Sequence, residues 1–212
     1  KLYMSIWQSI QDLFVYHRES PMIFNSGEFF VLFTVFLLVY SMVYRYRLVV
    51  SLWVIAFSFF FYYKSSGLYF FLLIFAVLKD FYLALLIKHP KYGKYHKWWV
   101  FLSVATSLGI LGYYKYTNLI LGTFATIVEN NFQPLDIFLP IGISFFTFQS
   151  ISYILDVNSN KVAPTTRILD YAFYLSFFPQ LVAGPIVKAN HFLPQLQRKI
   201  NPTRREIYAG LY

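Results

Sequence analysis

Long apolar runs joined by short basic connections constrain this chain more than any other feature of its sequence. Four such runs lie at residues 29–44, 48–63, 68–87 and 98–114. The first two are separated only by Arg45, Tyr46 and Arg47, and each is about 24 Å long as a helix. Terminal tyrosines can extend such helices into the interface of a bilayer whose core is about 30 Å thick. The pattern predicts transmembrane helices joined by tight turns.

The composition indicates a membrane environment. Of the 212 residues, 58% are hydrophobic and 13% are charged, whereas an average soluble domain is about 25% charged. A net charge of +9 would suggest a nucleic-acid partner for a soluble chain, but here the lysines and arginines occupy short connections, where they set topology. We therefore expect an integral membrane protein with no nucleic-acid partner. The absence of cysteine excludes disulfides and palmitoylation within this chain and leaves the compartment open.

The distribution of basic residues predicts the topology. The turn at Arg45 and Arg47 and the connection at residues 88–97 should both be cytoplasmic by the positive-inside rule. Residues 119–128 are too short to span comfortably, so we expect a re-entrant or interfacial piece there, and residues 139–157 should return to the cytoplasmic side. The tail after residue 186 is also basic. Residues 168–187 therefore cannot cross simply, and we expect them to enter the bundle and turn back.

The amino-terminal residues 1–24 are predicted to form an amphipathic, interfacial segment ahead of the transmembrane part, residues 25–212. Four apolar residues fall on one helical face of this segment: Ile6, Ile10, Leu13 and Phe14. Asn25 is the expected N-cap of the first transmembrane helix, with Glu28 three residues on and Phe24 packing against Phe29. In the fourth run, Ala105, Gly109 and Gly112 form a stripe where a neighbouring helix is expected to approach closely.

The stretch from residue 139 to residue 186 differs from a plain membrane span. Its apolar sequence is interrupted by prolines, glycines and polar residues, which are costly in hydrocarbon and survive where they line a protein cavity. Gln149, Ser152 and Asp156 are spaced by three and four, so a helix beginning near Pro140 would align them on one face. Two interpretations remain open: a hydrogen-bond ladder between helices, or the lining of a substrate tunnel.

Ionisable residues elsewhere give weaker signals. Lys79 and Asp80 interrupt the third apolar run, and because adjacent helical residues point in different directions, we expect each to pair with another helix rather than with its neighbour. Lys79 could also reach toward the interface. Three of the four histidines, His17, His89 and His96, fit solvated surface, and His191 fits the mouth of the broken segment. The sequence contains no metal-ligand cluster, phosphate loop or nucleophile elbow.

Four segments resemble a known family. LPIGISFFTFQSISYILDV, followed by LSFFPQLVAGPIVKANHFLPQL, resembles the signature region of the membrane-bound O-acyltransferases. MIFNSGEFFVLF and LGILGYYKYTNLIL are similar to the opening and the fourth-helix region of the same family. The resemblance is to the branch that contains the bacterial alginate O-acetyltransferase and the teichoic-acid D-alanyl transferase. The sequences FQSISYILDV and FPQLVAGPIV favour the acetylating enzymes within that branch.

The resemblance implies an all-α, polytopic helical bundle with broken, re-entrant helices, which is part of a funnel-shaped fold in the inner membrane of bacteria. The implied reaction moves an acyl group from a cytoplasmic donor to a hydroxyl group of an exported polysaccharide. The implied donor is acetyl-CoA or a carrier-linked acyl thioester, with no bound cofactor or metal. The implied partners are membrane lipid and periplasmic or extracellular acyltransferase proteins.

The family's essential histidine lies in a later membrane segment with a Trp-His motif, which does not occur in these 212 residues. The resemblance therefore implies a catalytic histidine beyond Tyr212, and we expect no catalytic residue in this chain and no activity from it alone.

The reaction that the resemblance implies sets what the rest of the protein must supply. A thioester donor is already activated, so the enzyme needs a base, a shielded passage and positioning of both substrates. We predict that ten residues line that passage: Pro140, Gly142, Ser144, Gln149, Ser152, Asp156, Pro179, Gln180, Gly184 and Pro185.

Two alternative functions remain. The chain could belong to a protein that transfers D-alanine to a teichoic acid-type polymer, or to a non-catalytic component of an export channel. A Trp-His motif in a later hydrophobic segment of the full-length protein would distinguish an acyltransferase from a channel component.

Overall fold

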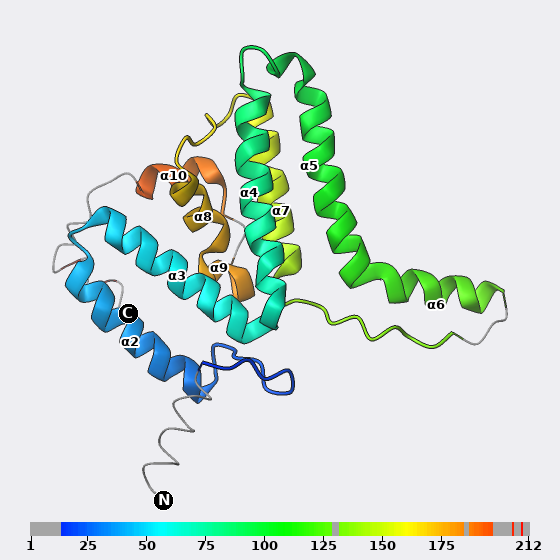
Figure 1. The fold of residues 1–212 in the computed structure, drawn as a ribbon, viewed down its shortest axis with the longest axis horizontal. Helices are drawn as coiled ribbons and strands as arrows, with labels where there is room; N and C mark the ends of the chain where they lie inside the picture. The colour runs from blue at the N-terminus through cyan, green and yellow to red at the C-terminus, as the bar shows by residue number, and fades with distance from the viewer. Residues whose placement is uncertain (1–13, 129–131, 185–186, 197–204, 206–208, 210–212) are drawn as a thin grey trace, which may run out of the picture.

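The computed structural model describes residues 14–128, 132–184 and 187–196, together with Arg205 and Ala209. Regular structure in these ranges is entirely helical, which confirms the predicted all-α fold class (Figure 1). The helices are α2 (Gly27–Val43), α3 (Arg47–Ser66), α4 (Phe70–Ile87), α5 (His96–Leu111), α6 (Thr117–Ile127), α7 (Ile143–Asn158), α8 (Ile168–Ser176), α9 (Phe178–Ala183) and α10 (Ala189–Leu196). The predicted amphipathic face at Ile6, Ile10 and Leu13 lies outside the described residues.

Ser26, not Asn25, caps the first described helix, so the predicted cap was wrong by one residue. The Ser26 hydroxyl accepts a hydrogen bond from the Phe29 amide at 3.2 Å. Both residue types favour this position, but Ser26 is the last residue with extended backbone, so its side chain reaches the free amide three residues on. Glu28 then lies 3.1 Å from the ammonium group of Lys64. The rings of Phe24 and Phe29 pack 5.1 Å apart, as expected.

The helical stretch Arg47–Ile87 is, among the described residues, the one helix that is long and apolar enough to cross a membrane, judged by length and composition. It contains α3, the 3₁₀ turn η1 (Gly67–Tyr69) and α4, and it turns back sharply at η1 (Figure 1). Gly67 has a positive φ of 61°, and a Cβ there would lie 2.8 Å from the ring of Tyr16. The left-handed backbone therefore makes the corner, which glycine adopts without steric cost.

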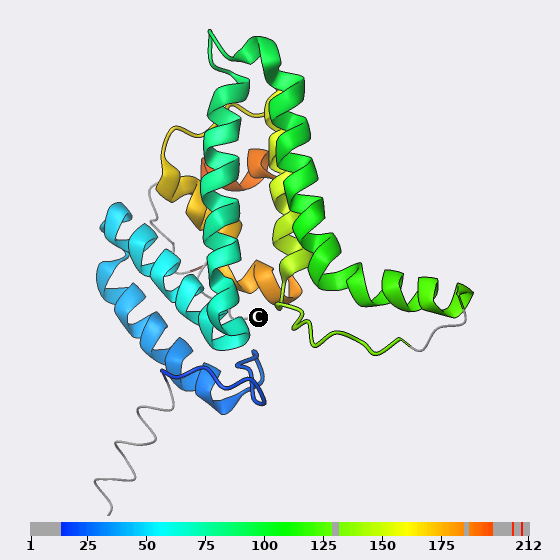
Figure 2. The ribbon, with the colours of Figure 1, turned by 45° about the vertical axis from the view of Figure 1, so that its right-hand side comes forward.

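Helices α4, α5 and α7 lie side by side, and α3 packs against the broken segment formed by α8 and α9 (Figures 1 and 2). The buried stripe of α5 consists of Ser103, Ser107 and Leu111. The predicted stripe of Ala105, Gly109 and Gly112 does not face a neighbour. Ala105 is exposed, and a Cβ at either glycine would meet no atom within 4 Å in the described chain. The register differs because the two serines bond to polar groups of α4.

Helix α6 leaves the bundle after a π-helical turn at Gly112–Tyr116 (Figure 2). Its large apolar side chains are exposed, among them Leu119, Phe124 and Ile127. The Asn118 side chain exchanges two hydrogen bonds of 2.9 Å with the backbone of Leu135, which holds the following extended segment against α6. Position and exposure fit the interfacial alternative predicted for residues 119–128, which the structure places outside the bundle and not re-entering it.

The two ends of the bundle differ in charge. At one end Arg47, Lys161 and Arg167 line a common hollow, and Lys88 donates to the Asn160 side chain at 2.7 Å. We call this the basic end. At the other end Arg18 bonds to Asp136 at 2.6 Å, and this carboxylate raises the pKa of the Arg18 guanidinium.

Candidate functional site

Residues 167–184 enter the bundle, and residues 187–190 lie again at the end where the segment started. Helix α8 begins after Arg167 and stops at Phe177, where the backbone leaves helical geometry (φ −55°, ψ 108°). Pro179 occupies the first turn of α9, where its missing amide costs no hydrogen bond. Helix α10 lies beside α8 (Figure 1), and its first residue, Ala189, lines the same hollow as Arg167. We call residues 167–184 and 187–190 the re-entrant segment.

The break between α8 and α9 is stabilised by side chains from two other helices. In a continuous helix the Phe178 amide would donate to the Tyr174 carbonyl. Here the Phe178 amide donates to the Ser58 hydroxyl of α3 at 3.2 Å, and the Tyr174 carbonyl accepts from Gln149 Nε2 of α7 at 2.9 Å. These two backbone groups are thereby satisfied within the protein, as broken helices at membrane depth require.

Aromatic packing fixes the same break from the side of α2 and α3. The ring of Phe178 lies between 5.1 and 6.5 Å, centroid to centroid, from the rings of Phe24, Phe29, Phe33, Phe36, Phe57 and Phe61. Phe178 is 4% exposed, so this cluster is part of the core. Such ring pairs contribute about 0.5–1.5 kcal/mol each beyond area burial.

Gly142 brings the start of α7 into backbone contact with α9. It has a positive φ of 76° and directly precedes Ile143, the first residue of α7. A Cβ on Gly142 would overlap the carbonyl oxygen of Leu181. The helix therefore begins three residues after the predicted start at Pro140, because Gly142 makes a left-handed turn first. Only glycine allows both this conformation and this approach.

Gln149 is the polar residue that joins α7 to both halves of the re-entrant segment. It is 2% exposed, and its Nε2 also donates to Gln180 Oε1 at 3.2 Å. These bonds join neighbouring helices, as the ladder interpretation predicts for Gln149, and a role of Gln149 in a tunnel wall stays a prediction. Gly184 lies close by, because a Cβ there would come within 2.6 Å of the Gln180 Cα.

The remaining predicted lining residues are more dispersed. Ser144 accepts from Lys115 Nζ at 3.4 Å, away from the re-entrant segment. Ser152 and Asp156 are half-buried on α7, and Pro185 lies outside the described residues. Of the nine predicted residues that the structure describes, none lines the two large hollows at the basic end. Their role as a tunnel wall stays a prediction.

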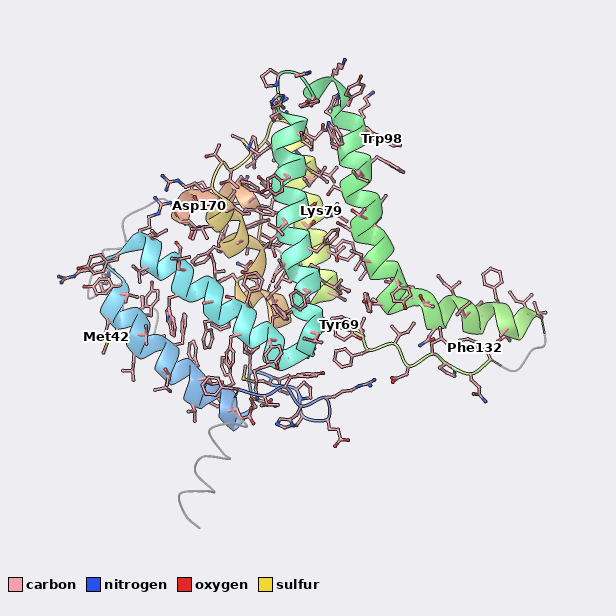
Figure 3. All side chains as sticks on the ribbon, in the orientation of Figure 1. Met42, Tyr69, Lys79, Trp98, Phe132 and Asp170 are labelled. Carbon is pink, nitrogen blue, oxygen red and sulfur yellow. The ribbon has the colours of Figure 1, made fainter. Side chains whose placement is uncertain are left out.

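A buried ion pair connects α4, α5 and α7. Lys79 Nζ lies 2.9 Å from Asp80 Oδ1, so the prediction that these neighbours do not pair was wrong. The lysine stem is long enough to fold back, and its ammonium group also bonds to the Ser107 hydroxyl at 2.6 Å and the Ser103 carbonyl at 3.1 Å. Asp80, fully buried, accepts from the hydroxyls of Ser103 and Ser150. Figure 3 labels Lys79 midway along α4.

Among the described residues, no histidine pairs with a carboxylate, as a catalytic histidine often does. His17, His89 and His191 are exposed, as their sequence context predicts. His96 is half-buried and its Nδ1 lies 2.8 Å from the Asn158 side-chain oxygen. Among the described residues, no group of three or more His, Cys, Asp or Glu could hold a metal ion.

The catalytic histidine that the family resemblance implies is not located by this structure. Tyr212, beyond which that histidine is expected, itself lies outside the described residues. The position of the histidine after Tyr212, and the inactivity of these 212 residues alone, therefore stay predictions.

Comparison with known proteins decides the family. The chain is 32% identical over 188 residues to the peptidoglycan O-acetyltransferase of Helicobacter pylori, an alignment that covers 76% of this chain. It is 38% and 36% identical over 105 residues to the probable alginate O-acetylases AlgI of Pseudomonas aeruginosa and Azotobacter vinelandii, covering 48% of this chain. The chain belongs to the membrane-bound O-acyltransferase family. No family model matches this chain. A search of solved structures also found no match.

The acyltransferase relatives are longer than this chain. The alignment covers 36% of the Helicobacter pylori protein and 20% and 21% of the two alginate O-acetylases. The chain therefore spans between about a fifth and about a third of the length of these relatives.

Replacing Gln149 by alanine should weaken the helical bundle locally without preventing membrane insertion. The change leaves the Tyr174 carbonyl without its partner, and a buried unsatisfied polar group costs about 1–3 kcal/mol. We expect the melting temperature of the full-length protein in detergent to fall by a few degrees. Ser152→Ala, one turn further along α7 and half-buried, is the matched control and should melt like the wild type. Equal melting of Gln149→Ala and wild type would contradict the ladder.

Proposed function

We propose that the full-length protein transfers acetyl groups to hydroxyl groups of an exported polysaccharide in the bacterial cell envelope. The observation that carries this proposal is the similarity, over 76% of the chain, to a protein named peptidoglycan O-acetyltransferase. The alginate O-acetylases give independent support, since their names also specify acetyl transfer to a polysaccharide. Two different acceptors among the relatives leave the acceptor sugar of this protein to be determined.

The acetyl donor is proposed to be acetyl-CoA or a carrier-linked thioester that approaches from the cytoplasm, and the protein to be a multi-pass protein of the inner membrane. What supports this orientation is the gathering of basic side chains at one end of the bundle, since such residues favour the cytoplasmic side. The proposed partners are membrane lipid and periplasmic or extracellular acyltransferase proteins.

Within this reaction the described residues position substrates and do not transfer protons. The re-entrant segment is held on α7 by Gln149 and Gly142 and on α3 by Ser58. Rigid placement of this kind favours reaction by orienting two substrates, and small displacements can lower rates strongly. The general base that deprotonates the sugar hydroxyl is proposed to come from a part of the protein beyond Tyr212.

The proposal is tested by deleting the full-length gene and analysing what mild base releases from exported polysaccharide and from peptidoglycan. We expect acetate to be lost from one of these polymers while the polymer itself is still made and exported, and to return on complementation. Unchanged acetate together with a loss of D-alanine would overturn the proposal in favour of D-alanyl transfer. Loss of the exported polymer itself would favour an export component.

A further inference from the structure

Two hollows at the basic end share a cationic mouth. One, of about 530 Å³, lies between the α7–α8 connection and α10, and the other, of about 550 Å³, lies between α3 and α8. Both are lined by Arg47, Thr166, Arg167 and Asp170. Lys161 lines the first as well. Their volumes fall within the range of about 300–1,000 Å³ that ligand sites occupy.

The mouth carries an excess of positive charge. It contains three cationic side chains, Arg47, Lys161 and Arg167, and one carboxylate, Asp170. Asp170 Oδ2 lies 3.8 Å from the Arg47 guanidinium. Within the described ranges, no carboxylate pairs with Lys161 or Arg167. Figure 3 labels Asp170 on α8 at this end of the bundle.

Helix dipoles add to this charge. Helices α3, α8 and α10 begin at Arg47, Ile168 and Ala189, and each of these residues lines at least one of the two hollows. Neither α3 nor α8 has a side-chain cap on its first amide groups. Positive ends of helices stabilise anions, most strongly where partly buried. The dipoles and the cations therefore act in the same direction.

The second hollow has an apolar wall below its cationic mouth. Leu48 from α3, and Ile168 and Leu169 from α8, line it beside Arg47 and Arg167. Leu48 is 62% exposed. A ligand that matches both features carries an anionic group next to an apolar chain. A soluble phosphate compound would use the mouth and leave the apolar wall uncovered.

We propose that this site binds an anionic phospholipid, with the headgroup phosphate at Lys161 and Arg167 and an acyl chain along Leu48, Ile168 and Leu169. The lipid would bridge α3 to the start of the re-entrant segment and so stabilise the point where that segment enters the bundle. The proposal does not depend on acetyl transfer, because it rests on the charge and shape of the two hollows.

The test is lipid binding to the purified full-length protein in detergent, measured by native mass spectrometry during titration with phosphatidylglycerol or phosphatidylcholine. Arg167→Gln and Lys161→Gln remove one exposed charge each and keep the pair of Arg47 with Asp170 intact. We expect each to weaken phosphatidylglycerol binding about fivefold, since a basic residue near an anionic lipid contributes about 1 kcal/mol. Lys91→Gln, an exposed lysine outside both hollows, is the control and should change binding less than about twofold.

Three outcomes would overturn the proposal. The first is equal affinity of the wild type for phosphatidylglycerol and phosphatidylcholine, and the second is equal weakening by Lys91→Gln and Arg167→Gln. The third concerns acetyl-CoA and inorganic phosphate, which are soluble compounds that also carry phosphate groups. If either binds in a manner that requires Arg167 while phosphatidylglycerol does not, the site holds a soluble phosphate compound instead of a lipid.

Discussion

Gly142→Ala is expected to destabilise the full-length protein by more than about 2 kcal/mol. The left-handed backbone at φ 76° costs a residue with a Cβ about 1–2 kcal/mol. The new methyl group would also overlap the Leu181 carbonyl oxygen, so α7 and α9 must move apart. Thermal unfolding in detergent measures the loss, and acetate on the exported polysaccharide should fall with it because the re-entrant segment is displaced.

Gly109→Ala is the matched control for this change. Gly109 lies inside α5, and a Cβ there would meet no atom within 4 Å in the described chain. Alanine is the better helix former by about 1 kcal/mol, so this variant should be as stable as the wild type or slightly more stable. If Gly142→Ala melts at the same temperature as Gly109→Ala, the backbone contact between α7 and α9 is not as described.

Asp80→Asn is expected to have the second large effect. It removes the counter-ion of Lys79, whose ammonium group is buried among α4, α5 and α7. Leaving one member of a buried pair unpaired typically costs about 3–5 kcal/mol. We expect a large drop in melting temperature and less folded protein in the membrane fraction. Asp80 is completely buried and the Lys79 side chain is only 9% exposed, so solvation compensates little for the lost counter-ion.

The double variant Lys79→Met, Asp80→Leu distinguishes the pair from the hydroxyl network around it. Replacing both members of a buried ion pair by apolar residues is often neutral, so the double variant should be more stable than Asp80→Asn. Asparagine at position 80 can still bond to the hydroxyls of Ser103 and Ser150, whereas the double variant loses both bonds. A double variant that is no more stable than Asp80→Asn would show that the serine bonds, and not the charge pairing, hold these helices.

The helices were largely predictable because apolar length is a local property of the sequence. The runs at residues 29–44 and 48–63 correspond to Gly27–Val43 and Arg47–Ser66. The ends of these helices were less predictable. Asn25 and Ser26 both favour the N-cap position, and only the backbone conformation in the folded chain decides that Ser26 caps α2. The departure of α6 depends on a π-helical turn and on Asn118 bonding across to Leu135, a contact between residues 17 apart.

The site was predictable where it depends on backbone breaks. Pro179, Gly142 and Gln149 were singled out because a plain membrane span has no use for them, and all three lie at the junction of α7 with the re-entrant segment. The Lys79–Asp80 pair was missed because a flexible lysine side chain overrides the directions of adjacent helical positions. The hollows at the basic end were not predicted, because membrane topology is a sufficient explanation for basic residues in the connections. The hollow beside α10 also depends on the return of α10 to the α7–α8 connection, which is a feature of the fold.

The most direct measurement is the acetate that base releases from exported polysaccharide, per molecule of full-length protein in the membrane. It compares deletion cells that carry the wild-type gene, Gln149→Ala or, as a control, Gln133→Ala, which removes an exposed glutamine outside the predicted passage. The expected result is no ester without the gene, full ester with wild type and Gln133→Ala, and clearly less ester with Gln149→Ala at equal protein amounts. Wild-type ester with Gln149→Ala would contradict a role for the α7 junction in acetyl transfer, and equal ester with and without the gene would contradict acetyl transfer itself.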